Sequence, residues 1–228
     1  MPVKEINFLD YKIKVNLRDE ADVSVASEIF NWREYRSAEE VIKNTTNPIL
    51  DIGAHAGFFS IYARLLNDSV TIYAVEPHPE NIKALGENLK ANHIDGVKIL
   101  ALAIADKTGE GKLAVSEDSH NHKLSTDEKI SDLSIKTSTL LDLLEKYKID
   151  AVGLLKMDIE GAEYAVLTAL KPGDWLKIDH LVLEYHDDTI NHHRQLEKLI
   201  RENGFSVQIF PSMFDKSMGF IMARNKRK

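Results

Sequence analysis

The chain has 228 residues, 43% of them hydrophobic, and a formal net charge of −7. This length is sufficient for one domain with a full hydrophobic core. The absence of cysteine excludes a disulfide framework, a thiolate zinc site and a cysteine nucleophile. The negative charge argues against a large nucleic-acid footprint, and no apolar stretch is long enough to span a membrane. We therefore expect a cytoplasmic protein that binds neither nucleic acid nor membrane.

The N-terminal segment precedes the main fold and has its own pattern. Apolar and polar residues alternate over 3–8 and 11–17, which predicts a small β-hairpin. Ser37 and Glu40 have the spacing of a capping box, which predicts the start of a helix. The hairpin edge could pair with a second subunit in a homodimer, although so short an edge is also stable alone.

A strand, a turn and a helix follow, and they form the most informative part of the chain. The apolar run 48–52 leads into a turn bracketed by Gly53 and Gly57, and an amphipathic helix follows the turn. A second apolar run, 70–75, ends in Glu76 and Pro77. This pattern predicts a β-α-β unit of the kind that binds nucleosides at the carboxyl ends of its strands.

Strands and helices continue to alternate as far as the C-terminus. The remaining expected strands are 97–103, 112–115, 151–157, 180–184, 205–210 and 219–223, and the expected helices include 79–92 and 194–203. Residues 116–132 are polar and aperiodic, which is typical of either a lid or a disordered loop.

The order of these elements predicts an α/β fold. We expect a three-layer, Rossmann-like, mostly parallel sheet with an antiparallel edge, preceded by a small N-terminal β-hairpin. The predicted division is an extension of hairpin and helix over 1–45 and a Rossmann-like domain over 46–228.

The first turn is a poor match to a dinucleotide-binding fingerprint. That fingerprint has glycine at the first, third and sixth positions, whereas His55 and Phe58 stand at the third and sixth here. An imidazole where the backbone must touch a pyrophosphate disfavours NAD and FAD. S-adenosylmethionine has no phosphate, and Glu76 stands where a ribose carboxylate is expected. The alternatives are that Asp51 caps the following helix and that Glu76 is an ordinary solvated residue.

The chain as a whole resembles the FkbM-type S-adenosylmethionine-dependent methyltransferases, from about residue 28 to about residue 184. The resemblance is carried by DIGAHAGFFS, EPHPENIKALGENLKAN, ALAIADKTG, STLLDLL and LLKMDIEGAEYAVL, in that order, and by EIF with Tyr35 ahead of the first strand. It implies a class I methyltransferase fold, a methionine contact from the first turn, a ribose contact from Glu76 and an adenine contact near Ala103. His55 stands where the family often has asparagine. The implied cofactor-binding residues are Asp51, Gly53, His55, Gly57, Glu76, Pro77 and Ala103.

The candidate catalytic residues follow two later strands. Asp158 and Glu160 come after the strand at 151–157, and Glu184 and His186 lie at the end of the strand at 180–184. Methyl transfer to a hydroxyl needs alignment and either a base or an acidifying metal. Asp158, Glu184 and His186 could hold Mg²⁺ or Mn²⁺, or His186 could act as the base.

Structural explanations for these side chains stay open. The acids after the strand at 151–157 also suit a helix start, and Lys156 could simply pair with Asp158. We expect His192 and His193 to be a surface pair at the start of a helix.

We therefore expect an S-adenosylmethionine-dependent methyltransferase that methylates oxygen on a sugar or another small hydroxylated metabolite. The alternatives are an NAD-linked or nucleotide-sugar oxidoreductase on the same sheet and a non-catalytic nucleoside-binding domain.

Overall fold

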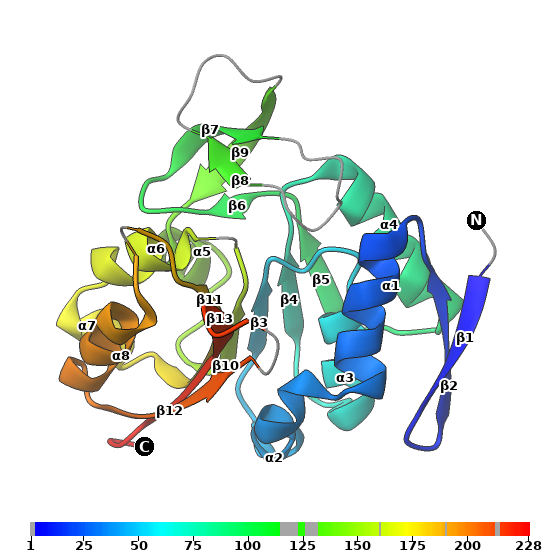
Figure 1. Cartoon of the computed structure of the whole chain (residues 1–228), viewed down its shortest axis with the longest axis horizontal. Coiled ribbons are helices and arrows are strands. Elements are labelled where there is room, and N and C mark those ends of the chain that lie inside the picture. Colours follow the sequence, from blue (N-terminus) through cyan, green and yellow to red (C-terminus); the bar gives the residue numbers. More distant parts are fainter. Residues whose placement is uncertain (1–2, 115–122, 126–131, 160, 190, 213–214) are drawn as a thin grey trace.

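The computed structural model describes residues 3–114, 123–125, 132–159, 161–189, 191–212 and 215–228. Within these residues a seven-stranded sheet runs through the centre of the molecule in the order β12-β13-β11-β10-β3-β4-β5 (Figure 1). Its strands are β3 (Ile49–Ile52), β4 (Ile72–Val75), β5 (Val97–Leu100), β10 (Val152–Met157), β11 (Ile178–His186), β12 (Phe205–Pro211) and β13 (Met218–Asn225).

The sheet is mostly parallel, as predicted. The five strands from β11 to β5 are parallel neighbours, whereas β13 pairs antiparallel with both β11 and β12. The antiparallel edge of the prediction is therefore confirmed. All residues of β3, β4 and β10 are buried, as expected for parallel strands covered on both faces.

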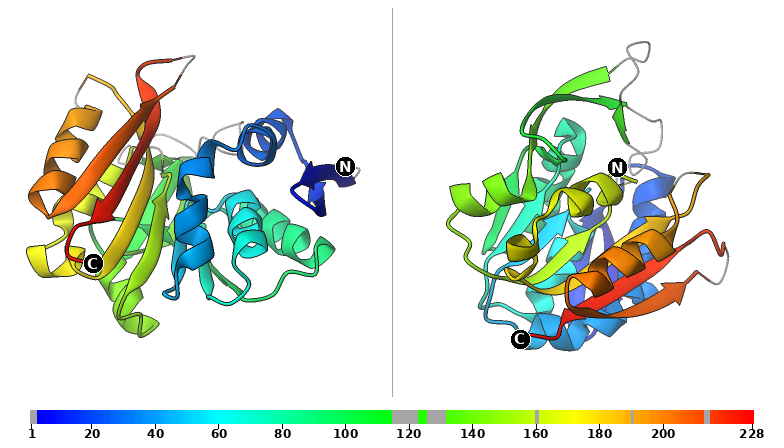
Figure 2. Two further views of the ribbon diagram at one scale, coloured as in Figure 1. Left: turned by 90° about the horizontal axis from the view of Figure 1, so that it is seen from below. Right: turned by 90° about the vertical axis from the view of Figure 1, so that its left-hand side faces the viewer.

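Helices cover both faces of the sheet, which gives three layers (Figure 2). Side chains alternate along β3, so that Ile49 packs on one face and Leu50 on the other. The first face is covered by α3 (Phe58–Leu66) and α4 (Pro79–Ala91). The second is covered by α5 (Leu140–Lys146), α6 (Glu163–Ala169), α7 (Pro172–Trp175) and α8 (His193–Glu202).

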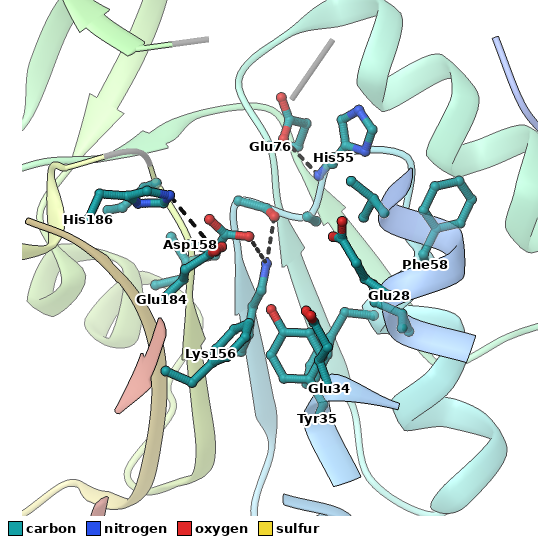
Figure 3. Close-up of a pocket in the computed structure, with 18 of the residues that line it drawn as sticks. Glu28, Glu34, Tyr35, His55, Phe58, Glu76, Lys156, Asp158, Glu184 and His186 are labelled. Atoms are coloured by element: carbon teal, nitrogen blue, oxygen red, sulfur yellow. Dashed lines mark hydrogen bonds and ion pairs between the residues drawn. The ribbon is translucent and has the colours of Figure 1, made fainter. Parts of the chain in front are cut away.

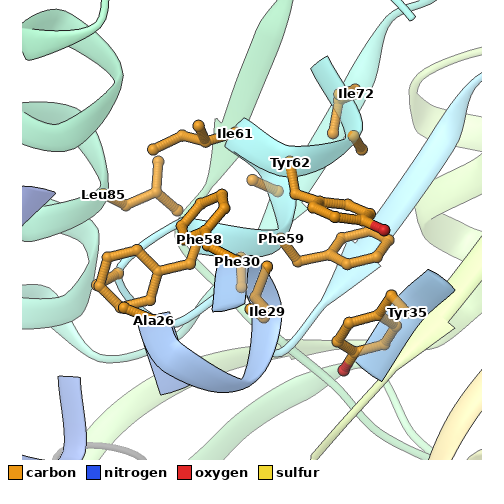
Figure 4. Packing of buried hydrophobic residues seen from close by; sticks show 14 of the residues in the cluster. Ala26, Ile29, Phe30, Tyr35, Phe58, Phe59, Ile61, Tyr62, Ile72 and Leu85 are labelled. Atoms are coloured by element: carbon orange, nitrogen blue, oxygen red, sulfur yellow. The ribbon is translucent and has the colours of Figure 1, made fainter. Parts of the chain in front are cut away.

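The N-terminal hairpin is present and packs against the first face. β1 (Val3–Phe8) and β2 (Tyr11–Asn16) pair antiparallel, and the Phe8 ring lies 4.9 Å from that of Tyr62 in α3. The backbone N–H of Asn16 donates to Asn88 of α4 at 2.7 Å. The extension therefore shares its hydrophobic core with the main sheet (Figure 4), and the division at residue 45 stays a prediction.

Between the hairpin and the sheet the chain is helical, but the predicted capping box is wrong. The segment contains α1 (Glu20–Ala26), the π-helix η1 (Ser27–Asn31), the 3-10 helix η2 (Glu34–Ala38) and α2 (Glu39–Asn44). The N-cap of α2 is Ala38, and its side chain makes no capping bond. Because the preceding turn is already helical, α2 has no free start at Ser37 to be capped.

A second, four-stranded sheet lies above the carboxyl edge of the main one (Figure 1). It contains β6 (Ala103–Ile104), β7 (Gly109–Ala114), β8 (Lys123–Ser125) and β9 (Asp132–Ser138). The predicted strand over 97–103 is therefore two strands in two sheets. The predicted loop over 116–132 contains β8, and the rest of the proposed lid lies outside the described residues, apart from Asp132 at the start of β9. Among the described residues no helix is long and apolar enough to cross a membrane.

Candidate active site

A cavity of about 760 Å³ opens at the carboxyl ends of β3, β4, β10 and β11 (Figure 3). Its walls also include residues from the N-terminal extension and from β12 and β13. Cavities of 300–1,000 Å³ are typical of small-molecule sites, and carboxyl strand ends are where open α/β sheets bind ligands. The cavity is therefore the candidate active site.

The two glycines of the first turn allow close approaches of the backbone. Gly53 has φ +78°, and a Cβ there would lie 1.8 Å from the carbonyl oxygen of Asp158. Gly57 has φ +84°, and a Cβ there would lie 2.8 Å from Leu85 Cγ in α4. Gly53 lines the cavity, whereas Gly57 is not among the lining residues. The absence of a side chain at Gly53 thus allows the ends of β3 and β10 to lie close together, and its absence at Gly57 allows α3 to pack closely against α4.

Glu76 is a buried acid that lines the cavity. It is 5% exposed, and its carboxylate accepts the backbone N–H of His55 at 2.9 Å, the backbone N–H of His78 at 2.9 Å and the Asn81 amide at 3.2 Å. Burial raises the pKa of Glu76, while these donors act in the opposite direction. The solvated alternative for Glu76 is wrong, because its carboxylate is held by the loop.

His55 links this loop to the N-terminal extension. Its Nε2 lies 3.1 Å from Arg18 Nη2 and 3.3 Å from Asp22 Oδ1. Arg18 also donates to both carboxylate oxygens of Asp22, which is fully buried, and to Asn81. The start of α1 therefore fixes His55, the second residue after the first glycine of the turn.

Asp51 lies behind the cavity wall and pairs with a buried lysine. It is fully buried, accepts the Ser60 hydroxyl at 2.7 Å and lies 3.3 Å from Lys156 Nζ. Asp51 is not among the lining residues. The alternative that Asp51 caps the following helix is wrong, because the N-cap of α3 is Gly57 and no side chain caps that helix.

Lys156 connects the first turn to Asp158. The alternative that Lys156 pairs with Asp158 is confirmed. Its Nζ donates to the carbonyl of Gly53 at 2.8 Å and lies 3.7 Å from Asp158 Oδ2. Burial lowers the pKa of Lys156, but the charges of Asp51 and Asp158 outweigh it and the pKa is raised. Lys156 is therefore a charged group between two carboxylates.

The remaining predicted cofactor residues lie on the same wall as Glu76. Pro77 follows it directly, and Ala103, 7% exposed, comes from β6. Leu102 and Ile104 flank Ala103 in the lining and make this side of the cavity apolar. An apolar wall beside a buried carboxylate suits a nucleoside, since one part of it contacts a flat base and the other a sugar hydroxyl.

The three predicted catalytic residues line the same cavity. Asp158 follows β10, and Glu184 and His186 lie at the end of β11, with His186 Nε2 3.8 Å from Glu184 Oε1. They do not form a compact ligand group: among the described residues, the metal-compatible group is Asp187, His192 and His193, whose ligand atoms lie within 4.8 Å of one another. Glu160 lies outside the described residues.

His192, the N-cap of α8, and His193, its first residue, are more than the predicted surface pair. His193 Nδ1 lies 2.7 Å from Asp187 Oδ2, and the backbone N–H of His193 donates to Asp187 Oδ1 at 2.6 Å. His192 Nδ1 accepts from Arg194 N at 3.2 Å. Asp187 and His192 therefore fix the start of α8 outside the cavity lining.

Several lining residues were not identified from the sequence as site residues. Glu28, Trp32 and Glu34 come from the N-terminal extension, and Phe210 and Asp215 come from the C-terminal part. The usable signal was a large aromatic residue, Trp32, in a polar stretch next to EIF. The C-terminal residues gave no signal, because only the antiparallel edge brings them to the cavity.

Sequence comparison relates the chain to known proteins. The methyltransferase FkbM domain profile matches residues 51–207. The 31-O-demethyl-FK506 methyltransferase FkbM of Streptomyces tacrolimicus is 27% identical over 190 residues, covering 70% of this chain and 72% of that protein. The hexuronic acid methyltransferase AglP of Haloferax volcanii is 23% identical over 213 residues, covering 90% and 84%.

Solved structures show the same fold at low sequence identity. A protein of Streptococcus mutans in complex with SAH aligns with TM-score 0.54 and 10% identity over 84% of this chain and 97% of that one. The precorrin-6y C5,15-methyltransferase of Geobacter metallireducens aligns with TM-score 0.52 and 13% identity over 85% and 88%. The fold is thus that of the class I methyltransferases.

The chain belongs to the FkbM methyltransferase family, and it is an S-adenosylmethionine-dependent methyltransferase. The oxidoreductase and the non-catalytic alternatives are not supported by these findings.

Proposed function

We propose that the protein transfers a methyl group from S-adenosylmethionine to a hydroxyl of a sugar or another small hydroxylated metabolite. The observation that carries this proposal is one continuous cavity, which joins the Glu76 carboxylate and the first turn to Asp158, Glu184 and His186. The names of the FkbM and AglP relatives support a small-molecule acceptor.

The residues of the cavity fit the donor. Glu76 offers lone pairs to the ribose hydroxyls, and the apolar wall at Pro77 and Ala103 suits the adenine. Gly53 and His55 are the parts of the first turn that line the cavity, so they are proposed to contact the methionine portion. Asp51 and Gly57 do not line the cavity. They are proposed to support it, Asp51 by pairing with Lys156 and Gly57 by allowing α3 to pack closely against α4. When bound, the donor supplies an electrophilic methyl group on a sulfonium.

The acceptor side needs alignment and a proton acceptor. His186 is the proposed base, and Glu184, 3.8 Å away, is placed to stabilise the imidazolium that forms when His186 takes the hydroxyl proton. Asp158 is held by Lys156 and orients the acceptor. The Mg²⁺ or Mn²⁺ considered from the sequence gains no support from the positions of these three ligands.

Ligand-induced stabilisation tests the donor. S-adenosylhomocysteine should raise the melting temperature, whereas NAD and ATP should not, because only a ligand that binds the native state stabilises it. An equal or larger shift with NAD would overturn the proposal. The predicted cytoplasmic location and homodimer are separate proposals, and the latter is tested by the mass of the protein in solution.

A further inference from the structure

The part of the cavity away from Glu76 has an unusual surface. We call it the acceptor mouth and define it by the lining residues Glu28, Trp32, Glu34, Asp158, Glu184 and Phe210. Glu28 lies in η1, Trp32 directly follows η1, and Glu34 begins η2. Asp158 follows β10, Glu184 lies near the end of β11, and Phe210 lies in β12. Figure 3 shows the carboxylates of Glu28, Asp158 and Glu184 around one space.

The cavity lining is strongly acidic. Among the described lining residues six are carboxylic acids, and Lys156 is the one lysine or arginine. Lys156 is 3% exposed and is already paired with Asp51 and Asp158. The donor, with a sulfonium, an ammonium and a carboxylate, brings a net charge of only +1. The acceptor mouth therefore stays negative when the donor is bound.

The titration of Glu34 is consistent with this excess of negative charge. Partial desolvation in the cavity, together with the charges of Glu28 and Asp158, raises the pKa of Glu34 to about 7. A further anion placed among these groups would meet like charges, and Lys156, the one lysine or arginine among the described lining residues, is already paired. Like-charge contacts of this kind are costly. Hydroxyl or ammonium groups of a ligand would instead donate hydrogen bonds to these carboxylates.

Two aromatic side chains complete the acceptor mouth. Trp32 is 60% exposed and Phe210 is 41% exposed, although both are large apolar residues. Exposed apolar surface rimmed by polar residues is typical of ligand-binding grooves. Aromatic rings bind the apolar C–H face of a pyranose and also attract cations. Carboxylates that line the same cavity as such rings match a sugar ring that presents hydroxyls at its edge.

We infer that the acceptor is an uncharged or cationic polyhydroxylated ring, and that the acceptor mouth rejects anionic sugars. This inference rests on the proposed function and narrows its acceptor. It also separates this protein from its AglP relative, which by name acts on a hexuronic acid. In that respect the two proteins differ although they share the family.

The test uses sugars that differ in charge and little else. The probes are the methyl glycosides of glucose, glucuronic acid and glucosamine, with the galactose and mannose series alongside, and formation of S-adenosylhomocysteine is measured. We expect the neutral or amino sugars to be favoured over the matching uronic acids by about ten-fold or more in kcat/KM, which corresponds to ~1.4 kcal/mol.

Charge-altered variants test the cause. Glu34→Lys and the double variant Glu28→Gln/Glu34→Gln should reduce this preference by about ten-fold, with the larger change in Glu34→Lys. Glu40→Gln is the control, since the Glu40 side chain is 81% exposed on α2 and is not part of the cavity lining. It should leave the preference unchanged.

The possible failures are distinguishable. If S-adenosylhomocysteine does not stabilise the protein, the proposed function fails first. If it does stabilise the protein, the inference is overturned by a preference for uronic acids, by an unchanged preference in Glu34→Lys, or by the absence of methylation on sugars of every charge. A melting temperature near that of the unchanged protein shows that each variant is folded.

Discussion

The two ends of the cavity are built in different ways. We call Glu76, the first turn and the Asp51–Lys156 pair behind that turn the donor end. Each charged group there is buried and already paired: Glu76 with three N–H donors, and Asp51 with Lys156 and Ser60. At the acceptor mouth the acids are partly exposed and two aromatic rings face solvent. The donor end is therefore pre-organised before any ligand arrives, whereas the acceptor mouth keeps acids and aromatic rings partly exposed to solvent, where a ligand would cover them.

This difference has an energetic meaning. Substitutions at the donor end should reduce the stability of the protein as well as cofactor affinity, because buried charges lose their partners. Substitutions at the acceptor mouth should change acceptor use and leave stability almost unchanged.

Lys156→Ala should be the most damaging single change. It leaves Asp51, which is fully buried, and Asp158 without their cation. Breaking a buried ion pair costs about 3–5 kcal/mol, because an uncompensated charge stays buried. The measurement is the free energy of unfolding from urea denaturation. Lys90→Ala, at an exposed position of α4, is the control and should change it by less than ~0.5 kcal/mol. A loss at Lys156 no larger than at Lys90 would contradict the paired donor end.

Glu163 should make stability dependent on pH. It is 1% exposed and accepts the backbone N–H groups of Ile159 and Gly161. Burial raises its pKa from 4.5 to about 7, against the effect of these donors. The folded state then binds the proton more tightly than the unfolded state, so the contribution of Glu163 to stability is full below pH 4.5 and is lost as pH rises to about 7.

Glu163→Gln should remove this dependence. Relative to the unchanged protein, the variant should gain up to about 3 kcal/mol between pH 4.5 and pH 8, because each pKa unit corresponds to ~1.4 kcal/mol. Urea denaturation at several pH values measures the difference, and Glu145→Gln at an exposed position of α5 is the control. A pH profile of stability parallel to that of the unchanged protein would refute the raised pKa.

Glu76→Ala should weaken S-adenosylhomocysteine binding by about ten-fold or more, since the charge-assisted hydrogen bond that we propose to the ribose would be lost together with the bonds that hold the loop. Glu76→Gln keeps an acceptor oxygen and should lose less. Isothermal titration calorimetry measures the affinity, and Glu80→Ala, exposed in the first turn of α4, is the control. An affinity unchanged in Glu76→Ala would remove this residue from the ribose site.

The same contrast explains what could be predicted from the sequence. The donor end is formed by residues close together in the chain, within one β-α-β unit, so that Glu76, the glycine turn and the parallel sheet could be anticipated from periodicity and spacing. Even there, the partner of Asp51 is Lys156, 105 positions away (156 minus 51), and the alternative that Asp51 caps the following helix was wrong.

The acceptor mouth depends on contacts that no local pattern encodes. Glu34 and Phe210 come from opposite ends of the chain and meet because β12 joins the sheet through the antiparallel strand β13. Asp158, Glu184 and His186 could be placed at strand ends, since parallel strands end at one edge. The distances between these side chains depend on side-chain directions, which do not follow from the sequence pattern, so the sequence alone does not show whether they form a metal site.

Trp32→Ala should have the smallest effect on stability and a selective effect on function. The ring is 60% exposed, so the free energy of unfolding should change by less than ~0.5 kcal/mol. If the ring binds the face of the acceptor, the KM for the best sugar probe should rise about five-fold, in line with ~1 kcal/mol for an aromatic contact. The affinity for S-adenosylhomocysteine should not change, because Trp32 lies in the acceptor mouth.

Tyr11→Ala is the matched control: Tyr11 is 46% exposed in the hairpin and is not a lining residue. Equal effects of the two substitutions on KM, or a loss of S-adenosylhomocysteine affinity in Trp32→Ala, would show that the two ends of the cavity are not separate in function.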